Sequence, residues 1–257
     1  MKVKSLGFIG GGRITKIVLQ ALVNRQIKFS SVQVYDTDPE VLLTLQEKYP
    51  EIQTSDSYDP VAEQEIVFIA LHPPVIMETL EKIKASITER TQLVSFAPKI
   101  SIEKIGAVLA TGNIARMIPN ATSYINEGYN PVAFSKEYSS SEKHSLLEIL
   151  KAMGNTFEVE ESKLEAYAMI SAMLPTYFWF QWEEMQKLGV QMGLKELESK
   201  EAVQQTLLAA IDLFYSSELS YQEVIDLIPV KPIGEHETQI SEMFRNKLMG
   251  LFQKIKP

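Results

Sequence analysis

The chain has 257 residues, with 25 Lys or Arg against 33 Asp or Glu and a formal net charge of −8. This acidic balance excludes the basic footprint of nucleic-acid binding, so we expect no nucleic-acid partner. There is no cysteine, and the three histidines are far apart, which excludes disulfides and leaves no expected metal site. No apolar run reaches the roughly 18 residues of a membrane span. We therefore expect a cytoplasmic protein without a membrane partner.

A glycine turn lies between the first predicted strand and the first predicted helix. Residues 3–9 are mainly apolar, Gly10 and Gly12 follow them, and residues 13–23 repeat their apolar positions at helical spacing. Such a turn lets the pyrophosphate of a dinucleotide approach the amides of a helix N-terminus. The third position of the pattern is Thr15 in place of Gly or Ala, which predicts a slightly wider helix-to-strand separation.

An acid ends the second predicted strand, residues 32–36. The carboxylate of Asp36 can accept hydrogen bonds from both hydroxyls of an adenosine ribose and would repel a 2′-phosphate, so it favours NAD(H) over NADP(H). The alternative interpretation of Asp36 is a simple turn carboxylate or a helix-capping partner. If NADP(H) is bound instead, Arg13 or Lys16 is the expected partner of the extra phosphate.

Three further segments, 65–70, 91–96 and 113–118, are apolar without alternation, as expected of parallel strands buried on both faces. A helix is expected at 75–87. Alternating strands and helices predict a doubly wound parallel sheet, which binds ligands beyond the carboxyl ends of its strands. The candidate cofactor-binding residues at these ends are Gly10, Gly12, Arg13, Ile14, Asp36, Leu71, His72, Pro73, Ala97 and Asn120. A loop histidine bonded to backbone is an equal interpretation of His72.

The second half of the chain has helical patterns and almost no strand signal. A short helix at 146–153 and a short strand at 157–159 precede it. Four helices are then predicted, at 164–173, 177–188, 195–214 and 240–255. We therefore predict a dinucleotide-binding domain at 1–159 and a helical domain at 160–257. The aromatic run 175–182 suits the centre of a bundle or a subunit interface.

The run Arg116-Met117-Ile118-Pro119-Asn120, followed by Glu127-Gly128, resembles the corresponding run of pyrroline-5-carboxylate reductases. The similarity extends over nearly the whole chain, including Gly7–Gly12, 100–103 and Pro175-x-Tyr177. The resemblance implies an α/β fold with an N-terminal Rossmann-type sheet and a C-terminal all-helical dimerisation domain. It also implies a homodimer, or a larger assembly of dimers, that transfers hydride from NAD(P)H to a cyclic imine to form proline.

The resemblance implies candidate site residues as well. Asn120 and Thr176 are the candidate catalytic residues, and the nicotinamide is expected near Asn120. The candidate substrate-binding residues in the helical domain are Glu183, which matches the family, and three residues that do not rest on a match, Lys231, Glu235 and Thr238. Lys231 is a candidate point charge for a carboxylate, and Thr238 is a candidate hydroxyl after a loop shift. An imine or amino-acid-like small molecule is the expected substrate.

The chain departs from the family where the substrate is held. A Ser-Pro-Gly-Gly-Thr-Thr loop of the family falls opposite residues 230–235, which contain no hydroxyl. Residues 228–232 are alternatively a rigid connector, and 235–237 are either an acid/base cluster or a solvated helix N-terminus. Two other functions therefore stay open: reduction of another imine or keto substrate, and dinucleotide sensing without catalysis.

Overall fold

The computed structural model describes residues 3–257; Met1 and Lys2, with which the predicted first domain begins, lie outside the described residues. The chain divides into unit 1, residues 3–172 with Phe252–Pro257, and unit 2, Met173–Leu251. This division falls later than residue 159, because the segment after it is fastened to the sheet. Glu165 bonds Arg116, and Ser171 bonds Asn120.

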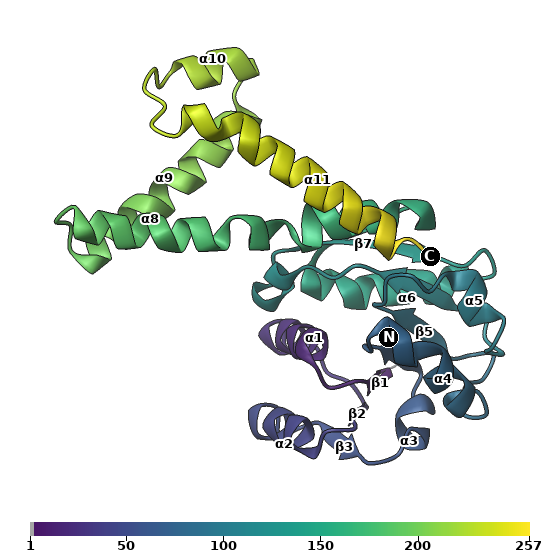
Figure 1. Ribbon diagram of the computed structural model, residues 1–257. Helices are drawn as coiled ribbons and strands as arrows, with labels where there is room; N and C mark the ends of the chain where they lie inside the picture. The colour runs from purple at the N-terminus through teal and green to yellow at the C-terminus, as the bar shows by residue number, and fades with distance from the viewer. Residues whose placement is uncertain (1–2) are drawn as a thin grey trace. The chain divides into compact units, whose positions relative to one another are not determined.

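The described residues of unit 1 form an eight-stranded sheet with the order β3-β2-β1-β4-β5-β6-β7-β8 (Figure 1). All neighbouring strands are parallel except the β6–β7 pair. The order 3-2-1-4-5-6 is that of a doubly wound dinucleotide-binding sheet. The strands are β1 (Ser5–Ile9), β2 (Ser31–Tyr35), β3 (Gln53–Ser55), β4 (Ile66–Ile69), β5 (Gln92–Ser95), β6 (Ile114–Met117), β7 (Gly128–Phe134) and β8 (Gly154–Glu158).

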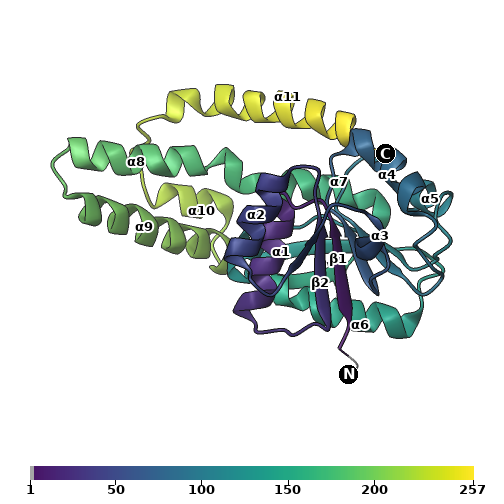
Figure 2. The same cartoon turned by 90° about the horizontal axis from the view of Figure 1, so that it is seen from below.

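Helices cover both faces of this sheet, so alternate residues of one strand enter different cores. Phe8 packs with residues of α1, α2 and α6, whereas Ile9 packs with residues of α3, α4 and α5. Figure 2 shows α1 and α2 on one side of β1 and β2 and α3 on the other. The helices are α1 (Arg13–Asn24), α2 (Pro39–Lys48), α3 (Asp59–Ala62), α4 (Pro73–Ile83), α5 (Ile102–Gly106), α6 (Ser140–Leu150) and α7 (Leu164–Tyr167).

Unit 2 is helical. Its elements are a 3-10 turn (Leu174–Tyr177), α8 (Trp179–Gln191), α9 (Glu196–Ser216), α10 (Tyr221–Asp226), a second 3-10 turn (Gly234–His236) and α11 (Glu237–Ile255), whose last residues belong to unit 1. Helices α8 and α9 approach closely at Gly189, where an added Cβ would lie 2.2 Å from the hydroxyl oxygen of the buried Ser199. That hydroxyl donates to the carbonyl of Gln186 at 2.7 Å.

The predicted fold class, a doubly wound parallel sheet followed by a helical half, is confirmed. Several element bounds differ from the predictions. Helix α4 begins at Pro73 and ends at Ile83, and the helix expected at 164–173 is α7 followed by one π-helical turn, Ala168–Ala172. Strand β7 is not among the predicted elements; it contains Pro131, whose carbonyl accepts from Ile118 N–H at 3.1 Å.

Candidate functional site

The sheet brings the predicted residues of unit 1 to one edge. Ile9, the last residue of β1, is in register with the last residues of β2 and β4, and β4, β5 and β6 continue in parallel. The segments that follow these strands therefore leave the sheet at its carboxyl edge. They contain the glycine turn, Asp36, Leu71 to Pro73, Ala97 and Asn120.

The glycine turn has the backbone that a close ligand approach requires. Gly10 has a φ of +105°, and an added Cβ would lie 2.5 Å from the carbonyl oxygen of Ala70, so no other residue fits. Gly12 is the N-cap of α1, has no side-chain cap, and leaves open space where a Cβ would stand. The first turn of α1 has no acidic residue. Its free amides and open flank fit an anionic group such as pyrophosphate.

Thr15 replaces the third glycine of the pattern without leaving a polar group unpaired. It is fully buried, and its hydroxyl donates to the carbonyl of Gly10. The larger side chain is thus accommodated by a hydrogen bond that ties the first helical turn to the glycine turn.

Asp36 is hydrogen-bonded to the same turn. Its Oδ2 accepts from the amide of Gly11 at 2.7 Å, and its Oδ1 accepts from the amide of Asp38 at 3.0 Å. A carboxylate oxygen can accept two hydrogen bonds, so each oxygen retains a position for a ribose hydroxyl. The bond from Asp38 N–H makes Asp36 a turn carboxylate as well, as the alternative interpretation predicts. The cap of α2 is made by Asp38, whose side chain accepts from Glu40 N–H.

The other predicted cofactor contacts of unit 1 surround this turn. Arg13 and His72 are exposed, whereas Ile14, Leu71 and Pro73 are half-buried. His72 is the N-cap residue of α4 and makes no side-chain cap. The role of these side chains toward a cofactor stays a prediction.

The side chain of Asn120 links two segments of unit 1 by hydrogen bonds. Its Nδ2 donates to both the carbonyl and the hydroxyl of Ser171 at 3.1 Å, and its Oδ1 accepts from the amide and the hydroxyl of Thr122. Both amide hydrogens and both lone pairs are therefore engaged. The side chain is 6% exposed. Asn120 thus fixes the loop after β6 to the π-helical turn.

Arg116, in β6, is a buried charged residue that is not among the predicted site residues. Its guanidinium contacts Glu161 at 2.8 Å and Glu165 at 2.6 Å. The signal for it in the sequence is an arginine inside an apolar strand, since an arginine is rarely buried unless it is paired.

The remaining predicted site residues belong to unit 2 and are exposed. The hydroxyl of Thr176 donates to the carbonyl of Met173 at 2.7 Å. Glu183 pairs with Lys187 at 2.8 Å, and the hydrogen bond from Lys187 lowers the pKa of its carboxyl. Glu235 lies 3.5 Å from the His236 ring, in the turn before α11.

Lys231 and Thr238 lie on either side of that turn. The carbonyl of Lys231 accepts from Gly234 N–H at 3.0 Å, and Thr238 is in the first turn of α11. The assignment of these unit 2 residues to a substrate stays a prediction.

Within residues 3–257, no three His, Asp or Glu side chains are grouped so that they could hold a metal ion. No helix in the same range is long and apolar enough to span a bilayer.

Two family models match the chain. The model described as NADP oxidoreductase, coenzyme F420-dependent, covers residues 5–99, and the model of pyrroline-5-carboxylate reductase dimerisation covers residues 161–255. The curated pyrroline-5-carboxylate reductase of Staphylococcus saprophyticus is 23% identical over 252 residues, which are 96% of this chain and 92% of the relative. That of Haemophilus influenzae is 27% identical over 213 residues, 82% of this chain and 78% of the relative.

A solved structure has the same fold. The pyrroline carboxylate reductase of Plasmodium falciparum with NADP bound matches with a TM-score of 0.84 at 23% identity, covering 100% of this chain and 98% of that chain. Sheet order, glycine turn and family models together define a Rossmann-type protein that binds a nicotinamide dinucleotide. Over nearly its whole length the chain is similar to pyrroline-5-carboxylate reductases, in line with the resemblance seen in the sequence.

Proposed function

We propose that the protein is an NAD(P)H-dependent reductase of a cyclic imine, with pyrroline-5-carboxylate as substrate and proline as product. The observation that carries the proposal is the hydrogen bond between the glycine turn and Asp36, in a chain whose relatives are named pyrroline-5-carboxylate reductases. This pair supplies a pyrophosphate site beside a ribose acceptor, as a nicotinamide coenzyme requires.

NADH is the proposed coenzyme in preference to NADPH. The carboxylate of Asp36 has free acceptor positions for two ribose hydroxyls, and its negative charge opposes a 2′-phosphate. Arg13 is exposed at the start of α1 and is the residue that would favour the phosphate. The proposal therefore assigns the preference to the balance between Asp36 and Arg13.

The chain's own contribution to the reaction is orientation. A bound reduced nicotinamide supplies the hydride. A protonated imine is already electrophilic, so the protein does not need a strong general acid. We propose that Asn120 holds the loop after β6 in place through its four side-chain hydrogen bonds. The hydroxyl of Thr176 is assigned to the substrate, because an oxygen that donates to Met173 still accepts.

The substrate carboxylate is assigned to Lys231, which offers a point charge where the chain has no hydroxyl loop. Glu183 and Glu235 are assigned to the protonated imine nitrogen of the substrate, and the hydroxyl of Thr238 is assigned to a hydrogen bond with a polar group of the substrate. The assignment of Glu183 rests on the resemblance, whereas those of Lys231, Glu235 and Thr238 rest on residue type and on exposure of the side chains.

A homodimer through unit 2 is part of the proposal. The described helices of unit 2 expose many large apolar side chains, among them Trp179, Phe180 and Tyr215, and the dimerisation model covers this region. A cytoplasmic location is also proposed, and fractionation of source cells with an antibody to the protein would test it.

The proposal is tested by following oxidation of NADH and of NADPH with a panel of substrates. We expect turnover with pyrroline-5-carboxylate, faster with NADH, and proline in the product mixture. Turnover confined to another imine or to a keto acid would replace the substrate and keep the reductase. Tight NADH binding without turnover of any panel member would favour the dinucleotide sensor, which the hydroxyl-free loop 230–235 makes the second candidate.

A further inference from the structure

Arg116 is the largest of the fully buried side chains, at 1% exposure in the middle of β6. It pairs with two carboxylates that come from one segment beyond the sheet. Nη1 donates to Glu161 at 2.8 Å, and Nη2 donates to Glu165 at 2.6 Å. Within residues 3–257 its Nε has no acceptor. The pairing is thus incomplete, and a buried charge of this kind is costly to keep.

The same three residues hold a loop of the candidate site. Arg116 Nη2 also donates to the carbonyl of Ala97 at 3.3 Å, and the carboxylate of Glu161 accepts from the amide of Ile102 at 2.7 Å. The segment between these contacts, residues 97–102, leaves the carboxyl edge of β5. It is therefore tied at both of its ends by one ion cluster.

The middle of this segment has a backbone that needs support. Lys99 has a φ of 72°, in the left-handed region, and its side chain is exposed. A residue other than glycine persists in this region only where surrounding contacts hold it. The contacts at Ala97 and Ile102 supply that constraint.

The sheet order indicates what the segment serves. Asp36 follows β2, the glycine turn follows β1, and β4 separates β1 from β5. A dinucleotide with its adenosine ribose at Asp36 and its pyrophosphate at α1 extends its other half along the edge toward β5. Residues 97–102 are then on the nicotinamide side of the site.

We propose that Arg116, with Glu161 and Glu165, is a positioning residue that fixes the segment 97–102 for the nicotinamide half of the coenzyme. This inference rests on the proposed use of a nicotinamide coenzyme. It does not depend on the imine substrate, so it is tested by binding alone.

The experiment compares calorimetric affinities for NADH and for ADP-ribose, which lacks the nicotinamide. Glu161→Ala removes the contact to Ile102 from a side chain that is 31% exposed, so the variant is expected to fold. We expect its Kd for NADH to rise about tenfold, as for loss of one hydrogen bond, with the Kd for ADP-ribose unchanged. Glu161→Gln keeps an acceptor for Ile102 N–H and should restore most of the affinity.

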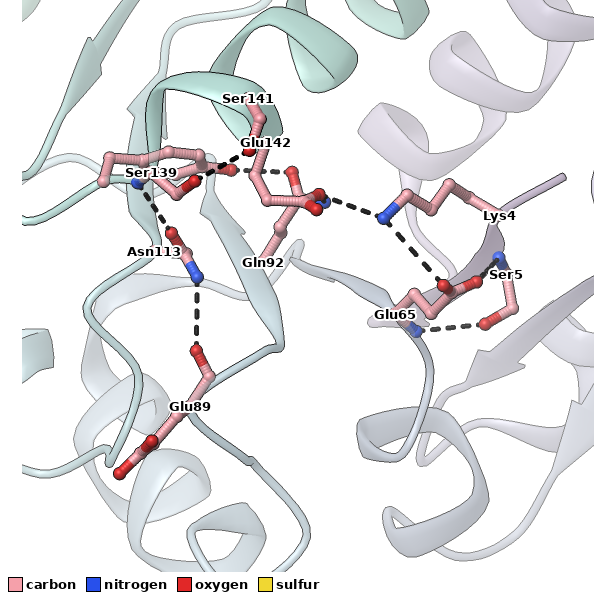
Figure 3. Close-up of polar contacts among 10 residues, drawn as sticks. Lys4, Ser5, Glu65, Glu89, Gln92, Asn113, Ser139, Ser141 and Glu142 are labelled. Atoms are coloured by element: carbon pink, nitrogen blue, oxygen red, sulfur yellow. Dashed lines mark hydrogen bonds and ion pairs between the residues drawn. The ribbon is translucent and has the colours of Figure 1, made fainter. Parts of the chain in front are cut away.

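Arg116→Lys is the second variant, because a lysine cannot make the forked contacts of a guanidinium. Its Kd for NADH should likewise rise, while its Kd for ADP-ribose stays unchanged. The control is Tyr138→Phe, which removes a 2.9 Å hydrogen bond to Gln92 at the other end of β5. Figure 3 shows Gln92 beside Glu142, whose carboxylate accepts from its side-chain amide. The Tyr138→Phe variant is expected to lose stability and to keep both affinities.

The inference is overturned if the Glu161→Ala and Arg116→Lys variants bind NADH and ADP-ribose with equally reduced affinity. It is also overturned if neither affinity is reduced. If the wild-type protein binds neither ligand, the proposed coenzyme is wrong and the inference falls with it.

Discussion

The amide of Gly11 donates a 2.7 Å hydrogen bond to the carboxylate of Asp36. This contact joins the turn after β1 to the end of β2, so the two parts of the predicted coenzyme site are fixed to each other by the chain itself. An added Cβ at Gly11 would lie 2.9 Å from a methyl of Leu45 and 3.4 Å from Asp36 Oδ2. A side chain at this position would therefore have to displace the end of the Leu45 side chain, and the hydrogen bond holds the carboxylate in place for the ribose.

Replacing Asp36 tests the coenzyme preference. Asp36→Ala removes the ribose acceptor and the charge that repels a 2′-phosphate, so the affinity for NADH should fall about tenfold or more while that for NADPH is retained or rises. Fluorescence titration with both coenzymes measures the ratio. The control is Asp38→Ala, which removes a helix cap two residues away. A wild-type protein that already binds NADPH more tightly would contradict the role given to Asp36.

Two glycines of the same turn should respond differently to alanine. At Gly12 the φ is −68° and no atom lies within 4 Å of an added Cβ, so Gly12→Ala should fold normally. The new methyl group occupies the space needed by the pyrophosphate, and we expect dinucleotide affinity to fall about tenfold or more. Thermal melting and calorimetry on the same sample separate the two effects.

Gly10→Ala should instead lower the stability of the folded protein, because positive φ and a contact of 2.5 Å to backbone cost about 2 kcal/mol or more. Gly250→Ala, at an open helical position of α11, is the matched control and should be neutral or stabilising.

For the Gly12→Ala variant, normal coenzyme binding would rule out the glycine turn as the pyrophosphate site.

Unit 2 should carry the subunit interface. Leu208, Ile211 and Tyr215 of α9 are 58%, 51% and 79% exposed and lie on one stripe of the helix, at i, i+3 and i+7. We expect light scattering to give twice the mass of one chain or more for the wild-type protein. The double variant Leu208→Glu/Ile211→Glu should lower that mass, whereas Thr206→Glu, on a different face of α9, should not. An unchanged mass in the double variant would place the interface elsewhere.

Two phenols, one half-buried and one buried, predict a loss of stability at alkaline pH. A hydrogen bond with Tyr58 and burial raise the pKa of Tyr35 to about 12, and burial raises the pKa of Tyr138 strongly. The folded state therefore holds these protons more tightly than the unfolded state. The resulting stabilisation is complete below about pH 10, the pKa of an unfolded tyrosine, and is lost as the pH rises toward about 12.

Urea unfolding at a series of alkaline pH values measures this loss. Tyr138→Phe removes one of the two phenols, so its free energy of unfolding should fall less steeply than that of the wild-type protein above about pH 10. Identical slopes would show that Tyr138 does not titrate differently in the folded state.

The coenzyme edge is predictable because its signals are local. A strand followed by glycines and a helix, and a strand followed by an acid, each lie within a few residues, and the alternation of strands and helices sets the sheet that joins them. At Thr15 the sequence predicts only a wider separation of helix and strand. It does not predict the hydrogen bond from the Thr15 hydroxyl to the Gly10 carbonyl. That bond depends on the carbonyl's direction, which the residue pattern does not contain.

The ion cluster around Arg116 is not predictable in the same way. Glu161 and Glu165 lie 45 and 49 residues further along the chain, and no local pattern selects them among 33 acidic residues. The same holds for Asn120, whose partner Ser171 is 51 residues away. By contrast, the pairing of Glu183 with Lys187 follows from i, i+4 spacing on a helix.

The most direct test of the proposed reductase is the transfer of deuterium. The protein is incubated with pyrroline-5-carboxylate and NADH that carries deuterium at both C4 positions of its nicotinamide, and the product is analysed by mass spectrometry. We predict proline that contains one deuterium atom, formed faster than with equally labelled NADPH. Absence of labelled proline with either coenzyme would contradict the account.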